Sequence, residues 1–158
     1  MPADTAFTIR EATWRDLFPV QDLEHECFRE DAWALIEMLG VLTFPGVVRY
    51  KAVGAGGELA GFIAGDVRAK DGCGWIMTVG VMPAYRRKGV AKALMAACES
   101  AMRLPLVKLT VRPSNLEAVA LYEKLGYTRH ETWPKYYHDG EDGLVMQREI
   151  PRAAGEGG

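Results

Sequence analysis

The stretch from Trp75 to Met82 (WIMTVGVM) is the part of the sequence that most limits the fold, because it is apolar on both faces. Such a run is typical of a strand at the centre of a sheet that is covered on both sides. Apolar residues then recur at helical spacing, which predicts a helix from about Lys88 to Met102 with one buried stripe, formed by Val90, Leu94, Cys98 and Met102. The centre of the chain is therefore predicted to be a strand, a turn and a helix.

The flanking segments complete a mixed β/α order. Before the central strand we expect a strand from Phe7 to Ala12, a helix capped by Thr13 or Asp16 and running to about Phe28, a short helix from Asp31 to about Leu42, and a hairpin of Val47 to Val53 with Glu58 to Arg68. After it we expect a strand from Val107 to Val111, a helix opened by a capping box of Ser114 and Glu117 and closed by Gly126, and strands from Tyr127 to Tyr137 and from Gly143 to Glu149.

The glycine run Gly54 to Gly57 is followed by a strand and by no Lys-Ser/Thr, so it predicts a hairpin turn and not a phosphate loop. We expect one α/β domain over residues 1–150 and a disordered tail over 151–158, which is small and polar.

Composition excludes several classes of function. The formal net charge of -2 predicts no nucleic-acid partner, and the absence of a long apolar run predicts no membrane span. The three cysteines are odd in number and lack metal-ligand spacing, which favours reduced thiols, a cytoplasmic location and no metal site. No signal peptide is evident at the start.

Cationic residues gather where the central helix begins. Arg86, Arg87 and Lys88 precede Gly89, at the end of a helix that presents unpaired N–H groups and a partial positive charge. Helix N-termini of this kind bind anions, and a glycine lets a ligand approach the backbone. From these residues alone, a cradle for a phosphate or pyrophosphate and a solvated basic helix start both stay open.

The pattern Arg86-x-x-Gly89-x-Ala91 after Val81-x-Pro83 resembles the acetyl-CoA signature of the Gcn5-related N-acetyltransferases (GNAT). A second resembling segment is NLEAVALYEKLGYT, which starts at Asn115 and contains Tyr122. The ending, Tyr136-Tyr137 followed by DGEDGLVM, is similar to RimI-like and Nα-type protein N-terminal acetyltransferases. The resemblance covers about residues 7–150. It implies a single-domain fold with a mostly antiparallel, twisted sheet, splayed at the cofactor site, of about six or seven strands and four helices.

The resemblance also implies roles for particular residues. The acyl donor is acetyl-CoA, whose pantetheine arm pairs with the backbone of Val79, Gly80 and Val81, and the amide of Val81 serves as the oxyanion donor. The pyrophosphate is held by the segment that follows: Arg86, Arg87, Lys88, Gly89, Val90, Ala91 and Lys92. Asn115 reaches the pantetheine, and Tyr122 donates a proton to the departing thiolate. Tyr136 and Tyr137 are the substrate-binding residues that the resemblance implies, and Glu26 is added as a further one because it belongs to an acidic cluster that could attract a cationic substrate.

The residues themselves agree with the role of Tyr122. Asn115 and Tyr122 are seven positions apart and share a helix face, with the small Ala118 between them. Attack of an amine on a thioester builds negative charge on oxygen and expels a thiolate, and a backbone N–H and a phenol meet these two needs. The alternatives are a packed aromatic at Tyr122 and a plain helix-start residue at Asn115. Tyr136 and Tyr137 are expected on a strand, with one of them facing the substrate.

One position departs from the resembling enzymes. Five residues before Asn115 they often carry Glu or His as general base, whereas this chain has Thr110, and Trp75 stands where some relatives have Tyr. The acidic cluster from Asp22 to Asp31 is interpreted as a solvated helix face that could attract a cationic substrate. The remaining candidates for the base are His25, His130, His138, Glu24, Glu26 and Glu30.

The sequence therefore predicts an N-acetyltransferase in which a primary amine attacks acetyl-CoA directly in a ternary complex. A protein or peptide α-amine is the first expectation for the substrate, because of Tyr136-Tyr137 and the DGED ending. A small amine such as a polyamine or an aminoglycoside is the second, and a non-catalytic acetyl-CoA-binding module is the third. The sequence leaves open whether the chain forms a homodimer.

Overall fold

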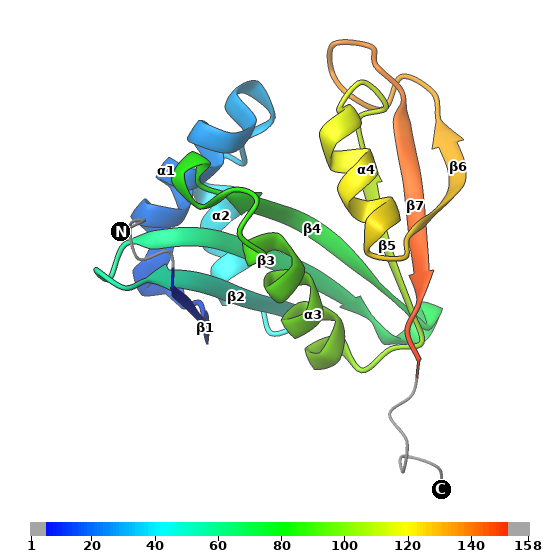
Figure 1. Ribbon diagram of the computed structural model, residues 1–158. Helices are drawn as coiled ribbons and strands as arrows, with labels where there is room; N and C mark the ends of the chain where they lie inside the picture. Colours follow the sequence, from blue (N-terminus) through cyan, green and yellow to red (C-terminus); the bar gives the residue numbers. More distant parts are fainter. Residues whose placement is uncertain (1–5, 152–158) are drawn as a thin grey trace, which may run out of the picture. The chain divides into compact units, whose positions relative to one another are not determined.

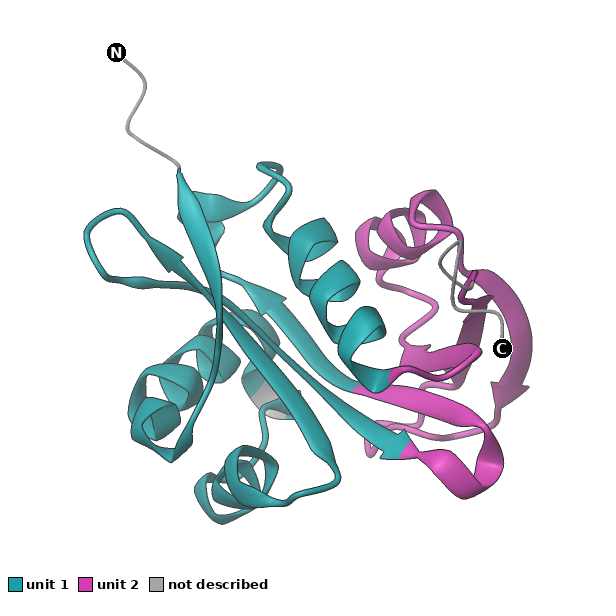
Figure 2. Ribbon diagram, turned by 90° about the horizontal axis from the view of Figure 1, so that it is seen from below, with its two compact units in different colours: residues 1–67, 77–102 teal, residues 68–76, 103–158 magenta. Residues whose placement is uncertain are grey.

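The computed structural model describes residues 6–151, which belong to two compact units (Figure 2). Unit 1 comprises residues 1–67 and 77–102, and unit 2 comprises residues 68–76 and 103–158. The expected tail beyond Pro151 lies outside the described residues. Hydrogen bonds join seven strands in the order β1-β2-β3-β4-β5-β7-β6, and four α-helices accompany them. This agrees with the expected mixed α/β fold.

Unit 1 carries the first strands and three helices (Figure 1). In chain order they are β1 (Phe7–Glu11), α1 (Leu17–Phe28), α2 (Leu35–Thr43), β2 (Val47–Gly54), β3 (Leu59–Arg68), β4 (Cys73–Val81, from Met77 onward) and α3 (Val90–Met102). Strands β1, β2 and β3 pair antiparallel. The expected turn between β2 and β3 is present, with Gly57 at a φ of 87°.

Helices cover both faces of the unit 1 strands, as the apolar central strand predicts. Phe62 and Ala64 of β3 join a buried cluster with Val20 and Leu23 of α1 and with Met38, Val41 and Leu42 of α2. The neighbouring Gly61 faces α3, since a Cβ there would lie 3.0 Å from side-chain atoms of both Val90 and Leu94. Alternate residues of one strand therefore bury opposite faces, which is the period-2 rule for strands.

Unit 2 is built on three strands and one helix: β5 (Leu106–Val111), α4 (Leu116–Lys124), β6 (Thr128–Trp133) and β7 (Gly143–Glu149). β7 lies between β5 and β6 and pairs antiparallel with both. The first residues of β4 belong to this unit and pair in parallel with β5, from Cys73 with Leu106 to Trp75 with Lys108. A parallel pair needs a crossover connection, and α3 supplies it.

Three expected element boundaries were wrong. α2 starts at Leu35 and not at Asp31, because Ala32 and Ala34 are extended after a short 3-10 turn. α3 starts at Val90 and not at Lys88, because Arg87 and Gly89 are left-handed, with φ of 63° and 84°. β6 ends at Trp133, because Pro134 has no N–H to donate and Lys135 is left-handed, with a φ of 50°.

No helix in the described part of the chain combines the length and the apolar character that a bilayer span requires. Cys73 and Cys98 are buried and Cys27 is half-buried, and all three are free thiols. Cys73 and Cys98 thus serve as small core residues.

Candidate active site

The end of β4 is tightly packed under α1, in unit 1. A Cβ on Gly80 would lie 3.0 Å from Leu23, 3.2 Å from Phe28 and 3.3 Å from the sulfur of Cys27. Contacts this close leave little room for a side chain, so Gly80 allows the helix to approach the strand. The backbone segment Val79–Val81, which we expect to bind the pantetheine arm, therefore lies directly beneath the second half of α1.

Hydrogen bonds hold the peptide group between Val81 and Met82 on both sides. The carbonyl of Val81 accepts from Sγ of Cys27 at 3.4 Å and from Nε of Arg86 at 3.2 Å. The amide of Met82 donates to the carbonyl of Ala60 at 2.8 Å. Burial raises the pKa of the Cys27 thiol, while Arg86 acts to lower it. The strand end is thus fixed in place before the chain turns toward α3.

The turn from Arg86 to Gly89 has the form of an anion-binding site. Its side chains are exposed, and the preceding Tyr85 is buried with its hydroxyl donating to the carboxylate of Glu58. Left-handed residues at Arg87 and Gly89 flank Lys88, and alternating backbone conformations of this kind can point successive N–H groups toward one anion. The carbonyl of Gly89 accepts the first helical bond, from Ala93 at 3.0 Å, so the N-terminus of α3 opens at the same turn.

A pyrophosphate fits these residues. A Cβ on Gly89 would meet nothing within 4 Å, so the backbone is open to a ligand at this point. Arg86, Arg87 and Lys88 supply positive charge beside the helix N-terminus. Val90 is buried, so it can contribute its backbone N–H but not its side chain, while Lys92 is exposed on the first turn.

Helix α4 of unit 2 begins with a different cap from the expected one. Oδ1 of Asn115 accepts from the amide of Ala118 at 3.1 Å, so Asn115 and not Ser114 is the N-cap. The amide and the hydroxyl of Ser114 instead donate to the carboxylate of Glu141, both at 2.9 Å. The predicted capping box of Ser114 with Glu117 was therefore wrong, because Ser114 donates its hydrogen bonds to a carboxylate from a distant segment.

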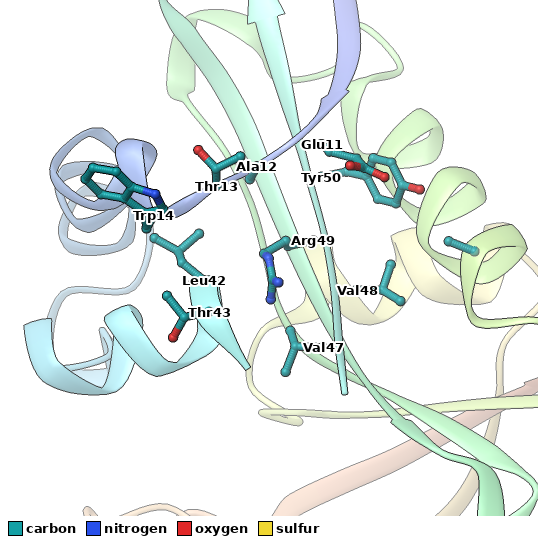
Figure 3. Close-up of a pocket in the computed structure, with 11 residues that line it drawn as sticks. Glu11, Ala12, Thr13, Trp14, Leu42, Thr43, Val47, Val48, Arg49 and Tyr50 are labelled. Carbon is teal, nitrogen blue, oxygen red and sulfur yellow. The ribbon is translucent and has the colours of Figure 1, made fainter. Parts of the chain in front are cut away.

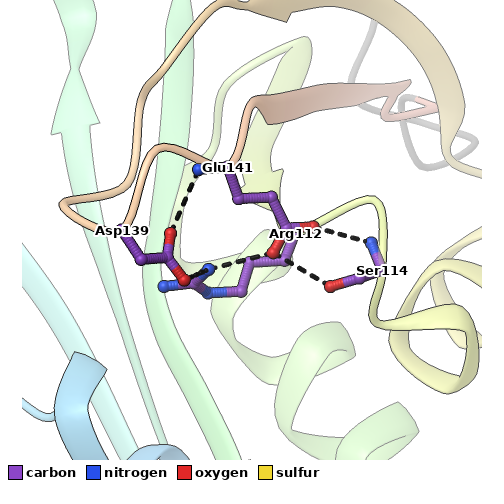
Figure 4. Close-up of polar contacts among 4 residues, drawn as sticks. All are labelled: Arg112, Ser114, Asp139 and Glu141. Carbon is purple, nitrogen blue, oxygen red and sulfur yellow. Dashed lines mark hydrogen bonds and ion pairs between the residues drawn. The ribbon is translucent and has the colours of Figure 1, made fainter.

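Figure 4 shows the polar cluster that makes this contact. Nη1 of Arg112 donates to Asp139 at 2.8 Å and to Glu141 at 2.9 Å, and the amide of Glu141 donates to Asp139 at 3.1 Å. The bonds from Ser114, followed by those from Arg112, lower the pKa of Glu141. The cluster ties the loop before β7 to the start of α4. The sequence carries no local signal for it, because Arg112 and Ser114 bond to acids that lie 27 or 29 residues along the chain.

Tyr122 is buried in unit 2 near the end of α4. It is 9% exposed and packs edge-on against Tyr127, with ring centroids 6.1 Å apart. The helix ends as predicted: Gly126 is left-handed, and the amide of Tyr127 returns to the carbonyl of Tyr122 at 2.9 Å. Burial, followed by the nearby Tyr137, raises the pKa of Tyr122 to about 12. The phenol therefore keeps its proton at neutral pH.

Tyr136 and Tyr137 lie in the loop after β6 and not on a strand, which corrects the expectation. Their rings pack against each other with centroids 4.9 Å apart, and Tyr136 also packs against Trp133 at 5.3 Å. Trp133 stacks on Trp75 at 5.5 Å, while the guanidinium of Arg112 lies 4.1 Å from the ring centre of Tyr137. These four aromatic residues form a continuous row, in which Tyr136 is 51% exposed.

The comparisons with known proteins decide the family. The profile of the Acetyltransferase (GNAT) family matches residues 6–127. The chain belongs to this family. The NAA10 catalytic subunit of the N-terminal acetyltransferase A complex of Arabidopsis thaliana is 32% identical over 149 residues, which cover 90% of this chain and 77% of that protein.

Solved structures agree with this membership. Ard1 from Thermoplasma volcanium superposes with a TM-score of 0.82 at 28% identity and covers 93% of this chain and 99% of its own. The ribosomal-protein-S18-alanine N-acetyltransferase of Escherichia coli superposes with a TM-score of 0.82 at 24% identity, over 96% of this chain and 98% of its own, which shows the shared fold. The GNAT protein is thus an enzyme that transfers an acetyl group from acetyl-CoA to an amine, not a non-catalytic binding module.

Position 110 of this GNAT enzyme offers no general base, because a threonine hydroxyl does not hold a transferred proton at neutral pH. Thr110 lies on β5 opposite Val145, and its methyl carbon would be 2.8 Å from a Cβ on Gly143. The other candidates are scattered: His25, His130 and His138 are exposed, and so is Glu26 on α1. The side chain of Glu30 lies outside the described part of the structure.

Glu24 departs from the expected solvated helix face. It is 1% exposed, whereas Asp22 and Glu26, two positions away on either side, are exposed. The interpretation of the acidic cluster as one solvated face was therefore wrong for Glu24. The helical period could have singled it out, since Val20 and Leu23 point to the same buried side.

An open hollow of about 590 Å³ lies elsewhere in unit 1 (Figure 3). It is lined by residues of β1 and the turn after it, of α2 and β2, and by Ala101 of α3. None of the predicted site residues lines it.

Proposed function

We propose that this GNAT enzyme acetylates the α-amine of a protein or peptide N-terminus by direct attack in a ternary complex. The observation that carries the proposal is the chemistry at position 110, where a threonine stands on β5 in place of an acid or an imidazole. The relatives support it, since NAA10 is the catalytic subunit of an N-terminal acetyltransferase complex. The exposed ring of Tyr136 adds an aromatic surface on which a peptide can pack.

The substrate preference follows from the pKa of the amine. An amine must be neutral to attack, and an α-amino group with a pKa near 7.7–8.0 is about a quarter or more neutral at pH 7.5. A lysine amine with a pKa near 10.4 is only about one part in a thousand neutral. Deprotonation therefore costs roughly 0.5 kcal/mol for the α-amine and roughly 4 kcal/mol for lysine. A site without a strong base on β5 favours the α-amine.

The reaction needs few groups from the protein. The amine nitrogen forms a bond to the thioester carbon, the carbon–sulfur bond breaks, the nitrogen loses a proton and the sulfur gains one. We assign the amide of Val81 to the negative charge that develops on the carbonyl oxygen. We assign the phenol of Tyr122 to the departing sulfur, because its raised pKa of about 12 keeps it in the protonated form.

Binding of the acetyl donor falls to the backbone and the cations. The turn from Arg86 to Gly89 and the first turn of α3 up to Lys92 are assigned to the pyrophosphate. Val79 and Gly80 are assigned to the pantetheine arm. Oδ1 of Asn115 already caps α4, so we assign its amide nitrogen to that arm.

Two peptides of one sequence test the proposal, with thiol release from acetyl-CoA as the readout. One has a free N-terminus and no lysine, and the other is N-blocked with a single lysine. We expect faster acetylation of the free N-terminus at pH 7.5. Comparable or faster acetylation of the lysine peptide would contradict the proposal.

A small cationic amine is the second candidate substrate. The exposed carboxylates of Asp22 and Glu26 on α1 favour it, because they can attract positive charge. Spermidine belongs in the same assay as a third acceptor. Turnover of spermidine that exceeds turnover of both peptides would replace the peptide proposal with this one.

A further inference from the structure

The carboxylate of Glu24 lies in the interior of unit 1 and forms no ion pair with another residue that the structure describes. Its Oε1 accepts a hydrogen bond from Oγ1 of Thr78 at 2.7 Å. Its Oε2 is buried and has no hydrogen-bond partner among the described residues. A buried acid with a free oxygen is costly, and unsatisfied polar atoms of this kind are rare in folded proteins. Folding alone gives no reason to keep a carboxylate there.

The position of Glu24 connects it to the predicted site. Thr78 stands on β4 directly before Val79, where the segment assigned to the acetyl donor begins. The neighbours of Glu24 on α1, Leu23 and Cys27, pack on Gly80 of the same segment. Glu24 thus reaches the strand at the residue that leads into the site, through a hydroxyl that can both accept and donate a proton.

The electrostatic surroundings place the titration of this group in the working range. Burial raises the pKa of Glu24 to about 7, while the hydrogen bond from the Thr78 hydroxyl and the nearby backbone of Trp33 act to lower it. Two other ionisable groups lie near this end of α1. Burial raises the pKa of the Cys27 thiol, and the guanidinium of Arg86 donates to the carbonyl of Val81 at the end of β4. Glu24 can therefore both take up and release a proton near neutral pH.

We propose that Glu24 accepts the proton of the attacking amine, and that the hydroxyl of Thr78 carries it there. As the nitrogen–carbon bond forms, an N–H proton passes to Oγ1 of Thr78, and the hydroxyl proton of Thr78 passes to Oε1 of Glu24. The electron pair of the broken carbon–sulfur bond stays on sulfur, which takes its proton from Tyr122. The inference rests on the proposed function, since it identifies the acceptor that Thr110 cannot be.

The acceptor matches the proposed substrate. Its pKa of about 7 lies within about one pH unit of an α-ammonium group at 7.7–8.0 and more than three below a lysine ammonium at 10.4. Removal of the ammonium proton before attack, with Glu24 as the acceptor, is therefore nearly balanced for an N-terminal amine and unfavourable for a lysine. The relay strengthens the preference for α-amines.

The decisive variant is Glu24→Gln, which keeps the size of the side chain and can still accept from Thr78, but cannot take up a proton. With the free N-terminus peptide we expect kcat to fall roughly 10²-fold or more, the size of a general-base contribution, with the KM for acetyl-CoA little changed. The wild-type kcat should fall as the pH drops below about 7, and this acid limb should be absent from Glu24→Gln. Glu99→Gln, which changes another buried carboxylate, on α3, is the matched control and should keep both kcat and the limb.

Thr78 provides an independent test that does not depend on the folding of the Glu24 variant. Thr78→Val removes the hydroxyl at nearly constant shape and should lower kcat by a similar factor, while Thr78→Ser should restore it. Melting temperatures identify any variant that is merely unfolded.

The outcomes separate this inference from the proposed function. A wild type that acetylates the free N-terminus, together with Glu24→Gln and Thr78→Val variants that keep kcat within twofold, overturns the relay and leaves the proposed function standing. A wild type that prefers lysine or spermidine overturns the proposed function. The relay is then decided by the same variants with the amine that the enzyme prefers, where retained kcat again overturns it.

Discussion

Two buried ionisable groups, one in each compact unit, both have a pKa raised by burial, but near neutral pH one can accept a proton and the other can only donate one. Burial raises the pKa of Glu24 in unit 1 to about 7 and the pKa of Tyr122 in unit 2 to about 12. The ordinary values of 4.5 and 10 lie on either side of neutrality, so the same physical cause brings the carboxyl into the working range and moves the phenol further from it. Near pH 7 the acid can accept a proton, and the phenol can only donate one.

Glu141 of unit 2 shows what happens to a carboxyl that is paired. Hydrogen bonds from Ser114 and Arg112 lower the pKa of Glu141 (Figure 4), whereas burial raises the pKa of Glu24. A paired carboxylate is fixed in its charged form and serves the structure. A buried carboxyl such as Glu24, which accepts a hydrogen bond from a hydroxyl but forms no described ion pair, is available for proton transfer.

The largest expected effect on kcat comes from removing the proton donor, the phenol of Tyr122. Tyr122→Phe removes the phenolic proton but keeps the ring and its packing on Tyr127, so kcat should fall roughly 10²-fold or more while acetyl-CoA binding changes little. Steady-state kinetics and calorimetric titration with acetyl-CoA measure the two quantities. If kcat is unchanged in a folded variant, with chemistry rate-limiting, Tyr122 is a packed core residue and not the proton donor.

The raised pKa of Glu24, the proposed proton acceptor, should make the free energy of unfolding depend on pH, whether or not Glu24 takes part in catalysis. The folded state holds the proton of Glu24 more tightly than the unfolded chain, so the stability that this group contributes is complete below pH 4.5 and is lost as the pH rises through about 7. The loss is about 3 kcal/mol at 1.36 kcal/mol per pH unit.

Glu24→Gln has no such loss. Relative to the wild type, it should therefore gain about 3 kcal/mol in the free energy of unfolding between pH 4 and pH 8. Urea unfolding at the two pH values measures this gain. A difference between the two proteins that is the same at both pH values would show that Glu24 titrates normally.

The smallest expected effect is on the stability contributed by Glu141, whose pH dependence should have the opposite sign to that of Glu24. The folded state favours the ionised form of Glu141, so its contribution is present above the ordinary glutamate pKa of 4.5 and disappears as the pH falls below it. Glu141→Gln should melt at a lower temperature than the wild type at pH 7, and the gap should narrow at pH 3.5. Salt should narrow it as well, because the cluster is partly exposed. Glu131→Gln, which changes an exposed residue of β6, is the control.

Much of the fold could be predicted because its signals are local. The apolar run of β4, the stripe of α3 and the glycine that closes α4 each depend on residues within a few positions of one another. The boundaries of α3 and β6 that were predicted wrongly also have local causes, but these lie in the backbone conformation of single residues. Arg87 and Lys135 are left-handed although neither is a glycine, and a sequence pattern does not signal such residues.

The site divides in the same way. The turn at Arg86–Gly89, which we propose to bind the pyrophosphate, could be predicted, because the cations, the glycine and the helix start are contiguous. The cap at Asn115 could not, because Glu141 draws Ser114 away from the helix across 27 residues.

The sequence by itself determined the family and the acetyl donor, and it carries the segment that we propose to bind this donor, since contiguous residues encode both the helix N-terminus and its charge. Only the tertiary structure decided between the neighbouring acids of α1. Glu24 and Glu26 are the same residue two positions apart, and their chemistry differs because one faces β4 and Thr78, 54 residues along the chain, while the other faces water. A pKa depends on burial and on partners, and both are set by packing between distant segments.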